Sequence, residues 1–268
     1  MKKVFQYKNK QLAYFVHGAG TPVILLHGFA ETNIIWKNQV PGLSGSFKLI
    51  IPDIPGSGES ELLGTGDEHL NIGALAECIN SILINENVDR CILLGHSMGG
   101  YITLCFAEKY PEKLKGFGLV NSTAFADSEE KIQNRLRGID IMQSYGGYAF
   151  IKNTTPNLFS DAFKQKNQQV MDDLIEEGKI FKTENLQEYY YAMMNRENKT
   201  EVLKKSSTPV LFVMGTEDIA APVKDLLKQV HLPEVSYIHI VENTGHMSML
   251  EAPEKLNRIL KQFVNEIE

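Results

Sequence analysis

The sequence predicts an α/β protein whose core is a mainly parallel sheet of about eight strands flanked by helices. Three observations lead to this prediction. Short apolar runs alternate with helical patterns, the first residues have the pattern of a hairpin, and one long interval carries helical patterns only. Because strands that alternate with helices form βαβ units, those strands should be parallel, whereas the N-terminal hairpin is antiparallel.

The alternation is found on both sides of the long helical interval. Apolar runs predict strands over residues 23–26, 48–52, 90–94, 116–120, 210–214 and 237–241. Helical periodicity predicts helices over residues 72–85, 101–109, 224–230 and 253–266. In the first of these helices, Ile72, Leu75 and Ile79 recur with helical spacing, so we expect this face to cover the sheet.

The N-terminal segment predicts the hairpin and lacks a targeting signal. Strands are expected over residues 2–7 and 11–17, joined by a turn. Polar residues at 8–11 interrupt the apolar stretch that a signal peptide would need. No other segment reaches the roughly 18 to 20 apolar residues of a membrane span. We therefore expect no membrane association.

Composition and charge favour an ordinary globular protein. At 268 residues, with 43% hydrophobic and 22% charged residues, the chain is long enough for one large α/β core with an insertion. The formal net charge of −6 argues against nucleic-acid binding. The histidines show no metal-ligand spacing and no cofactor motif is present, so we expect neither a metal nor a cofactor.

The cysteines indicate a reducing compartment. Cys78, Cys91 and Cys105 lie in apolar contexts without a Cys-x-x-Cys spacing, and an odd number cannot pair fully within one chain. We therefore expect buried thiols and a cytoplasmic location. The expected oligomeric state is a monomer or a homodimer.

A long interval between two predicted strands indicates an inserted helical cap. About 85 residues separate the strand that ends near Asn121 from the one that starts near Pro209, which is too many for a simple crossover. Helices are predicted there over residues 128–144, 148–152, 160–178 and 183–195. We assign residues 125–205 to the cap, and residues 1–124 and 206–268 to the α/β core.

Residues 95–99, Gly-His-Ser-Met-Gly, have the pattern of a nucleophile elbow. They follow an apolar strand and lead into a helix, so Ser97 would occupy the apex of a tight strand-to-helix turn. Such a strained turn needs small residues two positions to each side, and Gly95 and Gly99 meet this need. Taken alone, the match is equally compatible with a turn that has no chemistry.

Downstream residues supply the partners of a serine nucleophile in the order acid, then histidine. Asp218, which we prefer to the adjacent Glu217, lies just past the strand 210–214, where a parallel sheet displays functional groups. Asp218 could instead cap the helix after Pro222. His246 lies in the loop after the last predicted strand, where a general base can reach a serine and be oriented by a carboxylate.

The loop after the predicted strand 23–26 is the candidate for an oxyanion hole. Serine acyl transfer needs two hydrogen-bond donors for the tetrahedral oxyanion. The backbone amide of Met98 can supply one, and the amide of Phe29, or next that of Ala30, can supply the other. His27 in the same loop is expected to brace it through hydrogen bonds.

Together these elements resemble the α/β-hydrolase superfamily, specifically its small cap-bearing serine hydrolases, which include carboxylesterases, lactonases, cofactor-free haloperoxidase-like enzymes and carbon–carbon bond hydrolases. The resemblance covers nearly the whole chain and includes residues 53–60, which match the Asp-x-x-Gly-x-Gly-x-Ser segment of the family. In the family this segment is a structural turn. The resemblance implies an α/β-hydrolase fold with a catalytic triad of Ser97, His246 and Asp218. Dehalogenases and epoxide hydrolases of this fold carry an aspartate nucleophile and are excluded.

The predicted function is hydrolysis of a small carboxylic ester or related acyl compound through an acyl-enzyme intermediate. The same triad could hydrolyse a carbon–carbon bond, a lactone or a thioester, or catalyse perhydrolysis, because the pocket sets the substrate. A ligand-binding protein that retains the triad is a further alternative. Aromatic and methionine side chains of the cap are candidates for lining the pocket. Three cap arginines could bind a substrate carboxylate, although an ion-paired role is preferred: Arg135, Arg137 and Arg196.

Overall fold

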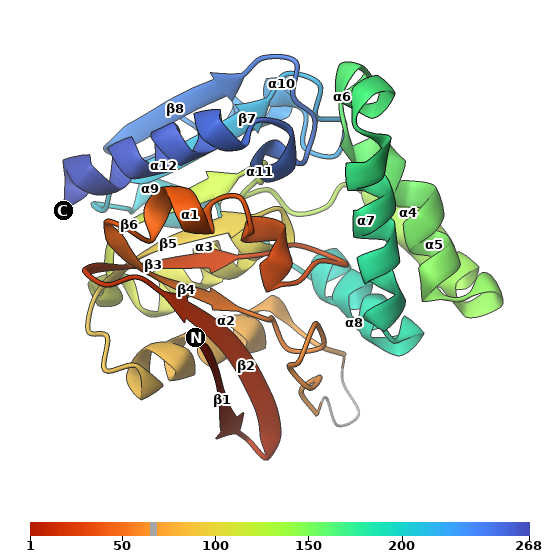
Figure 1. Cartoon of the computed structure of the whole chain (residues 1–268), viewed down its shortest axis with the longest axis horizontal. Helices are drawn as coiled ribbons and strands as arrows, with labels where there is room; N and C mark the ends of the chain where they lie inside the picture. Colours follow the sequence, from red (N-terminus) through yellow and green to blue (C-terminus); the bar gives the residue numbers. More distant parts are fainter. Residues whose placement is uncertain (65–68) are drawn as a thin grey trace.

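A computed structural model describes residues 1–64 and 69–268, and in these residues eight strands form one sheet (Figure 1). The strands are β1 (Lys2–Tyr7), β2 (Lys10–His17), β3 (Thr21–Leu26), β4 (Phe47–Pro52), β5 (Cys91–His96), β6 (Leu114–Val120), β7 (Val210–Gly215) and β8 (Ser236–Val241). Their order across the sheet is β1-β2-β4-β3-β5-β6-β7-β8. Only the pairs of β2 with β1 and with β4 are antiparallel. The predicted mainly parallel sheet with an antiparallel N-terminal hairpin is confirmed.

Helices connect most of the strands. The α-helices are α1 (Val40–Leu43), α2 (Ile72–Asn85), α3 (Met98–Lys109), α4 (Glu129–Tyr145), α5 (Gly147–Thr154), α6 (Asp161–Lys166), α7 (Gln168–Glu177), α8 (Thr183–Met194), α9 (Thr200–Lys204), α10 (Val223–Leu226), α11 (Ser248–Glu251) and α12 (Pro253–Ile267). Short 3-10 helices are η1 (Asn33–Trp36), η2 (Pro111–Lys113), η3 (Thr155–Leu158) and η4 (Gly178–Ile180).

Two hydrophobic layers hold the helices against opposite faces of the sheet. Successive side chains of a strand point to opposite faces, and in β3 Ile24 and Leu26 join the layer under α2 and α3. Val23 and Leu25 join the other layer, which contains α12. The buried residues of α12 recur with helical spacing: Leu256, Ile259, Leu260, Phe263 and Val264. Both faces of the central strands are therefore buried, whereas the edge strands β1 and β8 keep exposed side chains.

Only helices lie between β6 and β7, and we call residues 125–205 the helical insertion. In Figure 1, α4 to α8 form a group beside the end of the sheet toward which the parallel strands point. The insertion has a small apolar cluster of its own, made of Ile139, Met142, Phe150, Ile151, Phe181 and Leu186. Because functional groups of a parallel sheet lie at the carboxyl ends of its strands, the insertion is positioned next to them.

Two helices predicted from the sequence differ in the structure. The segment 160–178 was expected to form one helix, but it forms α6 and α7. Asn167 separates them: its backbone has left the helical region (φ −130°, ψ 41°), and its amide side chain donates to the carbonyl of Phe163 at 3.2 Å. Asparagine favours such local bonds to the backbone over helix continuation.

The helix expected over residues 224–230 is limited to the single turn of α10. Gln229 lies past its end and is fully buried. Its side chain donates to the carbonyl of Ser122 at 3.0 Å and accepts from the amide of Ala124 at 2.7 Å. These hydrogen bonds satisfy buried backbone groups of the segment that follows β6, and this requirement outweighs the local helical preference of residues 227–230.

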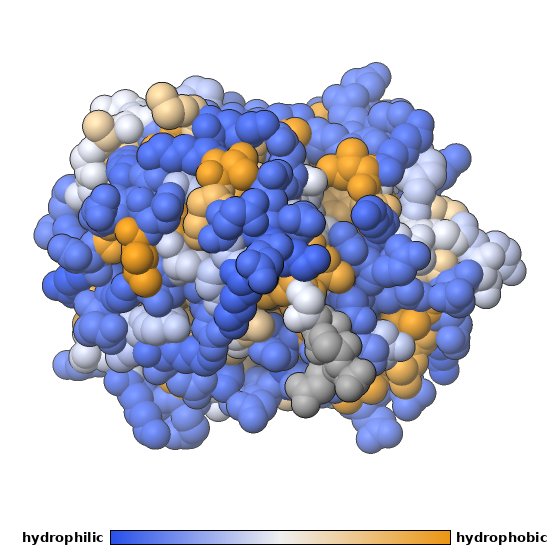
Figure 2. All heavy atoms as spheres, turned by 90° about the horizontal axis from the view of Figure 1, so that it is seen from below, coloured by the Kyte–Doolittle hydropathy of each residue, from blue (hydrophilic) through white to orange (hydrophobic). Residues whose placement is uncertain are grey.

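The surface is mainly polar. Figure 2 shows a face on which hydrophobic side chains form small groups separated by hydrophilic ones. Within residues 1–64 and 69–268, no helix is both long and apolar enough to cross a membrane. The same residues contain no cluster of histidine, cysteine and carboxylate side chains suited to a metal ion. The cysteines are free, and burial raises the pKa of the Cys78 thiol to about 12.

Candidate active site

Ser97 occupies a strained turn between β5 and α3. Its backbone lies at φ 50° and ψ −116°, outside the regions that L-residues prefer. A Cβ atom at Gly95 would lie 2.2 Å from the carbonyl oxygen of Gly99, and one at Gly99 would lie 2.6 Å from that of His27. The two glycines are therefore required sterically. Ser97 directly precedes the helix, so the first amides of α3 lie beside its hydroxyl.

Asp218 and His246 form a buried hydrogen bond. They lie in the loops after β7 and β8, and the Asp218 Oδ2 atom is 2.8 Å from Nδ1 of His246. The other carboxylate oxygen accepts from the backbone amides of Ala220 and Ala221 at 2.9 and 2.8 Å. Asp218 thus closes the turn that follows it, while its other oxygen orients the histidine. The alternative role, a cap on the helix after Pro222, is not formed, because α10 has no side-chain cap.

The two groups shift each other's pKa. Burial raises the pKa of Asp218, but the facing imidazole and the donated hydrogen bonds outweigh it and hold this pKa below its usual range. Burial lowers the pKa of His246, but the Asp218 carboxylate outweighs it and holds this pKa above the ordinary value. The pair therefore favours a charged carboxylate that stabilises a protonated imidazole.

Ser97 and His246 line the same cavity, which has a volume of about 300 Å³. Within the described residues, no hydrogen bond joins the Ser97 hydroxyl to His246. The structure thus brings all three predicted triad residues to one place and forms the contact between acid and histidine. The contact between histidine and serine is not formed.

The predicted oxyanion donors, Phe29 and Met98, lie on either side of Ser97. A Cβ atom at Gly28 would be 3.1 Å from the Cβ atom of Ser97, so the loop after β3 passes directly over the serine. Phe29 lines the cavity. In the part of the chain that the structure describes, neither the amide of Phe29 nor that of Met98 donates a hydrogen bond. Both donors are free for a ligand.

His27 braces the oxyanion loop, as the sequence predicted. Its Nε2 atom accepts from the amide of Ile54 at 2.9 Å and contacts the Ser57 hydroxyl at 2.9 Å. The segment 53–60 is a tight turn in which Asp53 accepts from the amides of Asn33 and Glu59. These residues therefore support the loop after β3.

A second buried acid and histidine, Glu31 and His96, connect three loops of the site. The Glu31 Oε2 atom accepts from the amide of Gly28 at 2.6 Å and lies 3.0 Å from Nδ1 of His96. The Nε2 atom of His96 lies 3.0 Å from the backbone carbonyl of His246. Both ring nitrogens of His96 thus face hydrogen-bond acceptors. The Glu31 carboxylate is held by His96 and by the amide of Gly28.

The electrostatics of Glu31 favour a charged carboxylate. Burial raises its pKa, but the charge of His96 and the hydrogen bonds from His96 and Gly28 outweigh burial and leave the pKa below its usual range. The sequence analysis did not find this pair. A histidine next to the nucleophile is visible in the sequence, but the glutamate 65 positions earlier carries no spacing signal that links the two.

Asn121 is another supporting residue that the sequence analysis missed. It follows β6 with a positive φ of 49°. Its amide donates to Asp218 Oδ2 at 2.9 Å and to the carbonyl of Gly245 at 3.2 Å, while its oxygen accepts from the Ser248 hydroxyl at 2.6 Å. Asn121 thereby ties the acid loop to the histidine loop. The available signal in the sequence was an asparagine directly after a predicted strand, because asparagine tolerates a positive φ better than most residues.

The helical insertion forms the side of the cavity facing Ser97. Among the aromatic and methionine residues proposed as pocket candidates, Tyr190 and Met193 line the cavity, together with Leu158. Tyr145, by contrast, is 75% exposed, and Phe150 lies in the apolar cluster of the insertion. Phe181 also packs within the insertion, whereas Phe159 and Tyr189 pack into the two layers of the core.

The three cap arginines have protein partners. Arg135 and Arg196 both contact the buried carboxylate of Asp127, at 2.6 and 2.9 Å. Arg137 contacts only the Asn134 side chain, at 3.4 Å. The preferred ion-paired interpretation thus describes Arg135 and Arg196, although Arg135 also lines the cavity.

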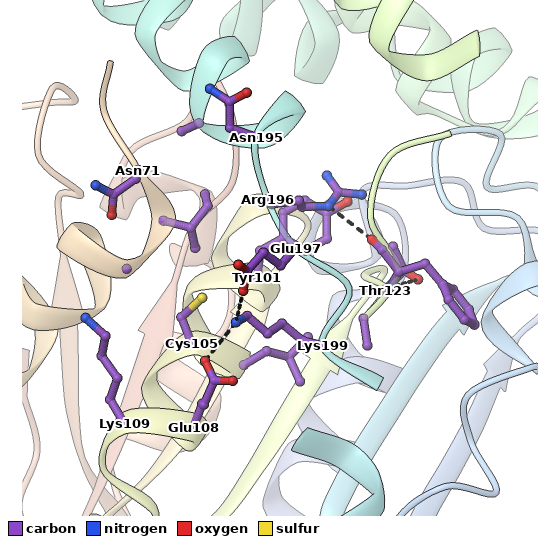
Figure 3. Close-up of a pocket in the computed structure, with 16 residues that line it drawn as sticks. Asn71, Tyr101, Cys105, Glu108, Lys109, Thr123, Asn195, Arg196, Glu197 and Lys199 are labelled. Atoms are coloured by element: carbon purple, nitrogen blue, oxygen red, sulfur yellow. Dashed lines mark hydrogen bonds and ion pairs between the residues drawn. The ribbon is translucent and has the colours of Figure 1, made fainter. Parts of the chain in front are cut away.

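A second cavity of about 350 Å³ lies on the other side of Tyr101, which lines both. The guanidinium of Arg196 stacks 3.5 Å from the centre of the Tyr101 ring. Figure 3 shows Lys199 between Glu108 and Glu197, which it contacts at 2.8 and 2.9 Å. The charged groups of this cavity thus neutralise one another, and none of them forms a nucleophile and base pair in the described residues.

Comparisons with known proteins agree with the fold and cover nearly the whole chain. The family model described as alpha/beta hydrolase fold matches residues 21–253. The (E)-2-((N-methylformamido)methylene)succinate hydrolase of Acinetobacter baylyi is 26% identical over 276 residues, which cover 98% of each chain. The solved structure of a thermophilic esterase from Thermogutta terrifontis with malate bound superposes with a TM-score of 0.90 at 26% identity, covering 96% of this chain and 94% of that one.

Another relative is longer than this chain. The dihydrolipoyllysine-residue acetyltransferase component of the acetoin cleaving system of Pseudomonas putida is 26% identical over 250 residues. The match covers 91% of this chain but 64% of that protein. This chain therefore spans less than two thirds of that relative's length.

Proposed function

The chain belongs to the α/β hydrolase fold family, and on this basis we propose that it is a serine hydrolase that cleaves a small carboxylic ester or related acyl compound. One observation carries the proposal. A buried pair of Asp218 and His246 opens onto the cavity that contains Ser97, at the apex of a strained turn beside two unused backbone amides. Ser97, His246 and Phe29 line this cavity, Asp218 is hydrogen-bonded to His246, and Met98 directly follows Ser97, which supports these roles.

The proposed reaction has two half-reactions. His246 takes the proton of the Ser97 hydroxyl while the serine oxygen attacks the substrate carbonyl, and the oxyanion accepts hydrogen bonds from the Phe29 and Met98 amides. The protonated histidine then gives its proton to the leaving alcohol, which leaves an acyl group on Ser97. Water, deprotonated by the same histidine, attacks this ester and releases the acid. Asp218 keeps the imidazole in the required tautomer throughout.

The open contact between Ser97 and His246 fits this mechanism. Catalytic hydrogen bonds in ligand-free enzymes are often long and tighten when substrate binds. The backbone amides of Ser97 and His246 donate to the carbonyls of Val120 and Leu158, so the backbone at both residues is held in place.

The experiment that tests the proposal is turnover of p-nitrophenyl acetate and butyrate by the purified protein and by Ser97→Ala. We expect measurable turnover that the substitution lowers by about a thousandfold or more. A fluorophosphonate probe should label the wild-type protein at Ser97 and fail to label the variant. Unchanged turnover in Ser97→Ala, or labelling at another residue, would reject Ser97 as the nucleophile.

A second candidate keeps the same residues and changes the bond that is cleaved. The Acinetobacter baylyi relative is named as a hydrolase of a succinate derivative, and the Thermogutta terrifontis protein as an esterase. Because the triad chemistry is shared, a panel of lactones, thioesters and carbon–carbon bond substrates separates the candidates. Ester turnover at background alongside rapid cleavage of one of these would replace the ester proposal.

A further inference from the structure

Helix α4 gives the cavity of Ser97 a basic side. Lys131 and Arg135 are four residues apart, so they lie on the same face of the helix, and Asn134 lies beside them. All three line the cavity. Much of the rest of the lining is apolar: Phe29, Leu158, Tyr190, Met193, Ile219, Ala220 and Ala221. The cavity therefore combines an apolar body with one cationic side.

Positive charge exceeds negative charge on this side. Arg135 and Arg196 share the carboxylate of Asp127, through contacts of 2.6 and 2.9 Å. Lys131 forms no ion pair within the described residues, and its ammonium donates to the carbonyl of Ala220 at 3.3 Å. Three cations thus face one carboxylate. Partial desolvation lowers the pKa of Lys131, and repulsion from Arg196 and Arg135 lowers it further against the attraction of Asp127.

The other acids near the cavity have partners of their own. Glu31 is bound to His96, and Asp218 is bound to His246. Asp225, which faces Lys131 from α10, forms an ion pair with Lys228 at 2.7 Å. None of these three carboxylates is therefore free to neutralise the basic side.

Hydrogen-bond donors remain available there. Arg135 uses its Nε atom for Asp127, and its two terminal amino groups have no hydrogen-bond partner among residues 1–64 and 69–268. The guanidinium lies 5.0 Å from the centre of the Tyr190 ring, which fixes its plane. A guanidinium and an ammonium held side by side match the geometry and charge of a carboxylate.

We propose that this basic side is a subsite for a carboxylate of the substrate, held by Lys131 and Arg135 while the ester group lies at Ser97. The inference rests on the proposed function. It makes the substrate class a short amphipathic ester with one anionic end, in place of a fully apolar ester. The carboxylate belongs either to the acyl part or to the alcohol part, and a different substrate pair tests each.

The test compares kcat/KM within pairs of matched esters. p-Nitrophenyl hemiglutarate against p-nitrophenyl pentanoate probes the acyl side, and 4-acetoxybenzoate against phenyl acetate probes the alcohol side. We expect wild-type protein to prefer the anionic member of one pair, and Lys131→Met to lower that ratio about tenfold or more, since hydrogen bonds to charged groups are worth this much. High salt should lower the wild-type ratio as well.

Arg137→Met is the matched control, because it removes one positive charge from the same helix outside the cavity. This variant should retain the wild-type ratio. Equal effects of Lys131→Met and Arg137→Met, or no anionic preference in either pair, would overturn the subsite. Thermal unfolding of both variants shows whether either change disturbs the fold.

Calorimetric titration with glutarate separates the two proposals. Binding that Lys131→Met weakens about tenfold supports the subsite even if every ester is inert, and that result rejects only the proposed function. Ester turnover without anionic preference, and without glutarate binding, rejects only the subsite.

Discussion

The carboxyl edge of the sheet and the helical insertion contribute to the same cavity, but they satisfy their polar groups differently. At the sheet edge, Asp218 and Glu31 are each buried and bound to a histidine as well as to backbone amides. On the insertion, Arg135 and Arg196 share the carboxylate of Asp127, and Lys131 has no ion-pair partner among the described residues. The buried acids of the first region are paired without a ligand, whereas the second region leaves positive charge for a ligand to neutralise.

This difference separates two tasks. Reacting groups must be held within a fraction of an ångström, which a sheet cross-linked by buried hydrogen bonds provides. Recognition of a substrate needs unpaired donors and a shape that varies between relatives, which helices added outside the sheet provide.

Removing the base should have the largest effect. We expect His246→Gln to lower kcat for p-nitrophenyl butyrate by about a millionfold, and Asp218→Asn to lower it by about ten-thousandfold because the imidazole loses its oriented tautomer. Steady-state kinetics measure both. A variant of the insertion that causes an equal loss would contradict the division of tasks.

Breaking the Glu31 and His96 pair should lower both stability and rate. Glu31→Gln replaces the charged partner in a buried hydrogen-bonded pair with a neutral amide, so the free energy of unfolding should fall by about 3 kcal/mol. The rate should fall about tenfold or more, because Gly28 and the His246 loop lose their common support. Urea unfolding and ester kinetics measure the two effects.

Glu77→Gln is the control for that variant, since Glu77 forms partly exposed ion pairs with Lys8 and Lys109. Its effect on stability should stay below about 1 kcal/mol. If Glu31→Gln is equally mild, the pair does not organise the site.

The acidic limb of the pH profile should reflect His246. The base must be neutral to accept the serine proton, and its pKa is raised by Asp218, so kcat/KM should fall tenfold per pH unit below an apparent pKa above about 6.5. The same shift makes the folded state bind the proton more tightly than the unfolded state. Its contribution to stability is therefore present at pH below about 6.5 and is lost as the pH rises through the folded-state pKa.

His17, whose pKa is lowered by burial, provides the control. His17→Gln should leave the acidic limb in place. A limb centred below pH 6 would show that the buried carboxylate does not raise the pKa of the base.

The smallest effect on the kinetics is expected from a change in the apolar side of the cavity that the insertion supplies. Leu158→Ala should raise KM for p-nitrophenyl butyrate about threefold and leave kcat within twofold, because it removes binding that is equal in the ground and transition states. Its backbone carbonyl, which accepts from the His246 amide at 2.7 Å, is retained. A large fall in kcat would place Leu158 among the groups that position the base.

Sequence patterns predicted most of the sheet edge. About eight strands and their mainly parallel direction were predicted from apolar runs, and small residues at 95 and 99 from the steric needs of the turn at Ser97. The order of the strands across the sheet was not predicted. Asp218 and His246 were expected in the loops where the structure places them. These features are local: a strand, a tight turn or a loop after a strand is encoded by neighbouring residues.

Only the tertiary structure decided the pairing of groups that are far apart in the chain. Glu31 with His96, Asn121 with Asp218, and Lys131 with the cavity of Ser97 depend on how the loops and the insertion fold onto one edge of the sheet. The breaks at Asn167 and after α10 likewise depended on hydrogen bonds made in the folded chain. The sequence by itself thus determined the fold class and the predicted triad. Burial and charge in the folded state decided which polar groups are satisfied and which remain for a substrate, because desolvation acts on the assembled site and not on the local chain.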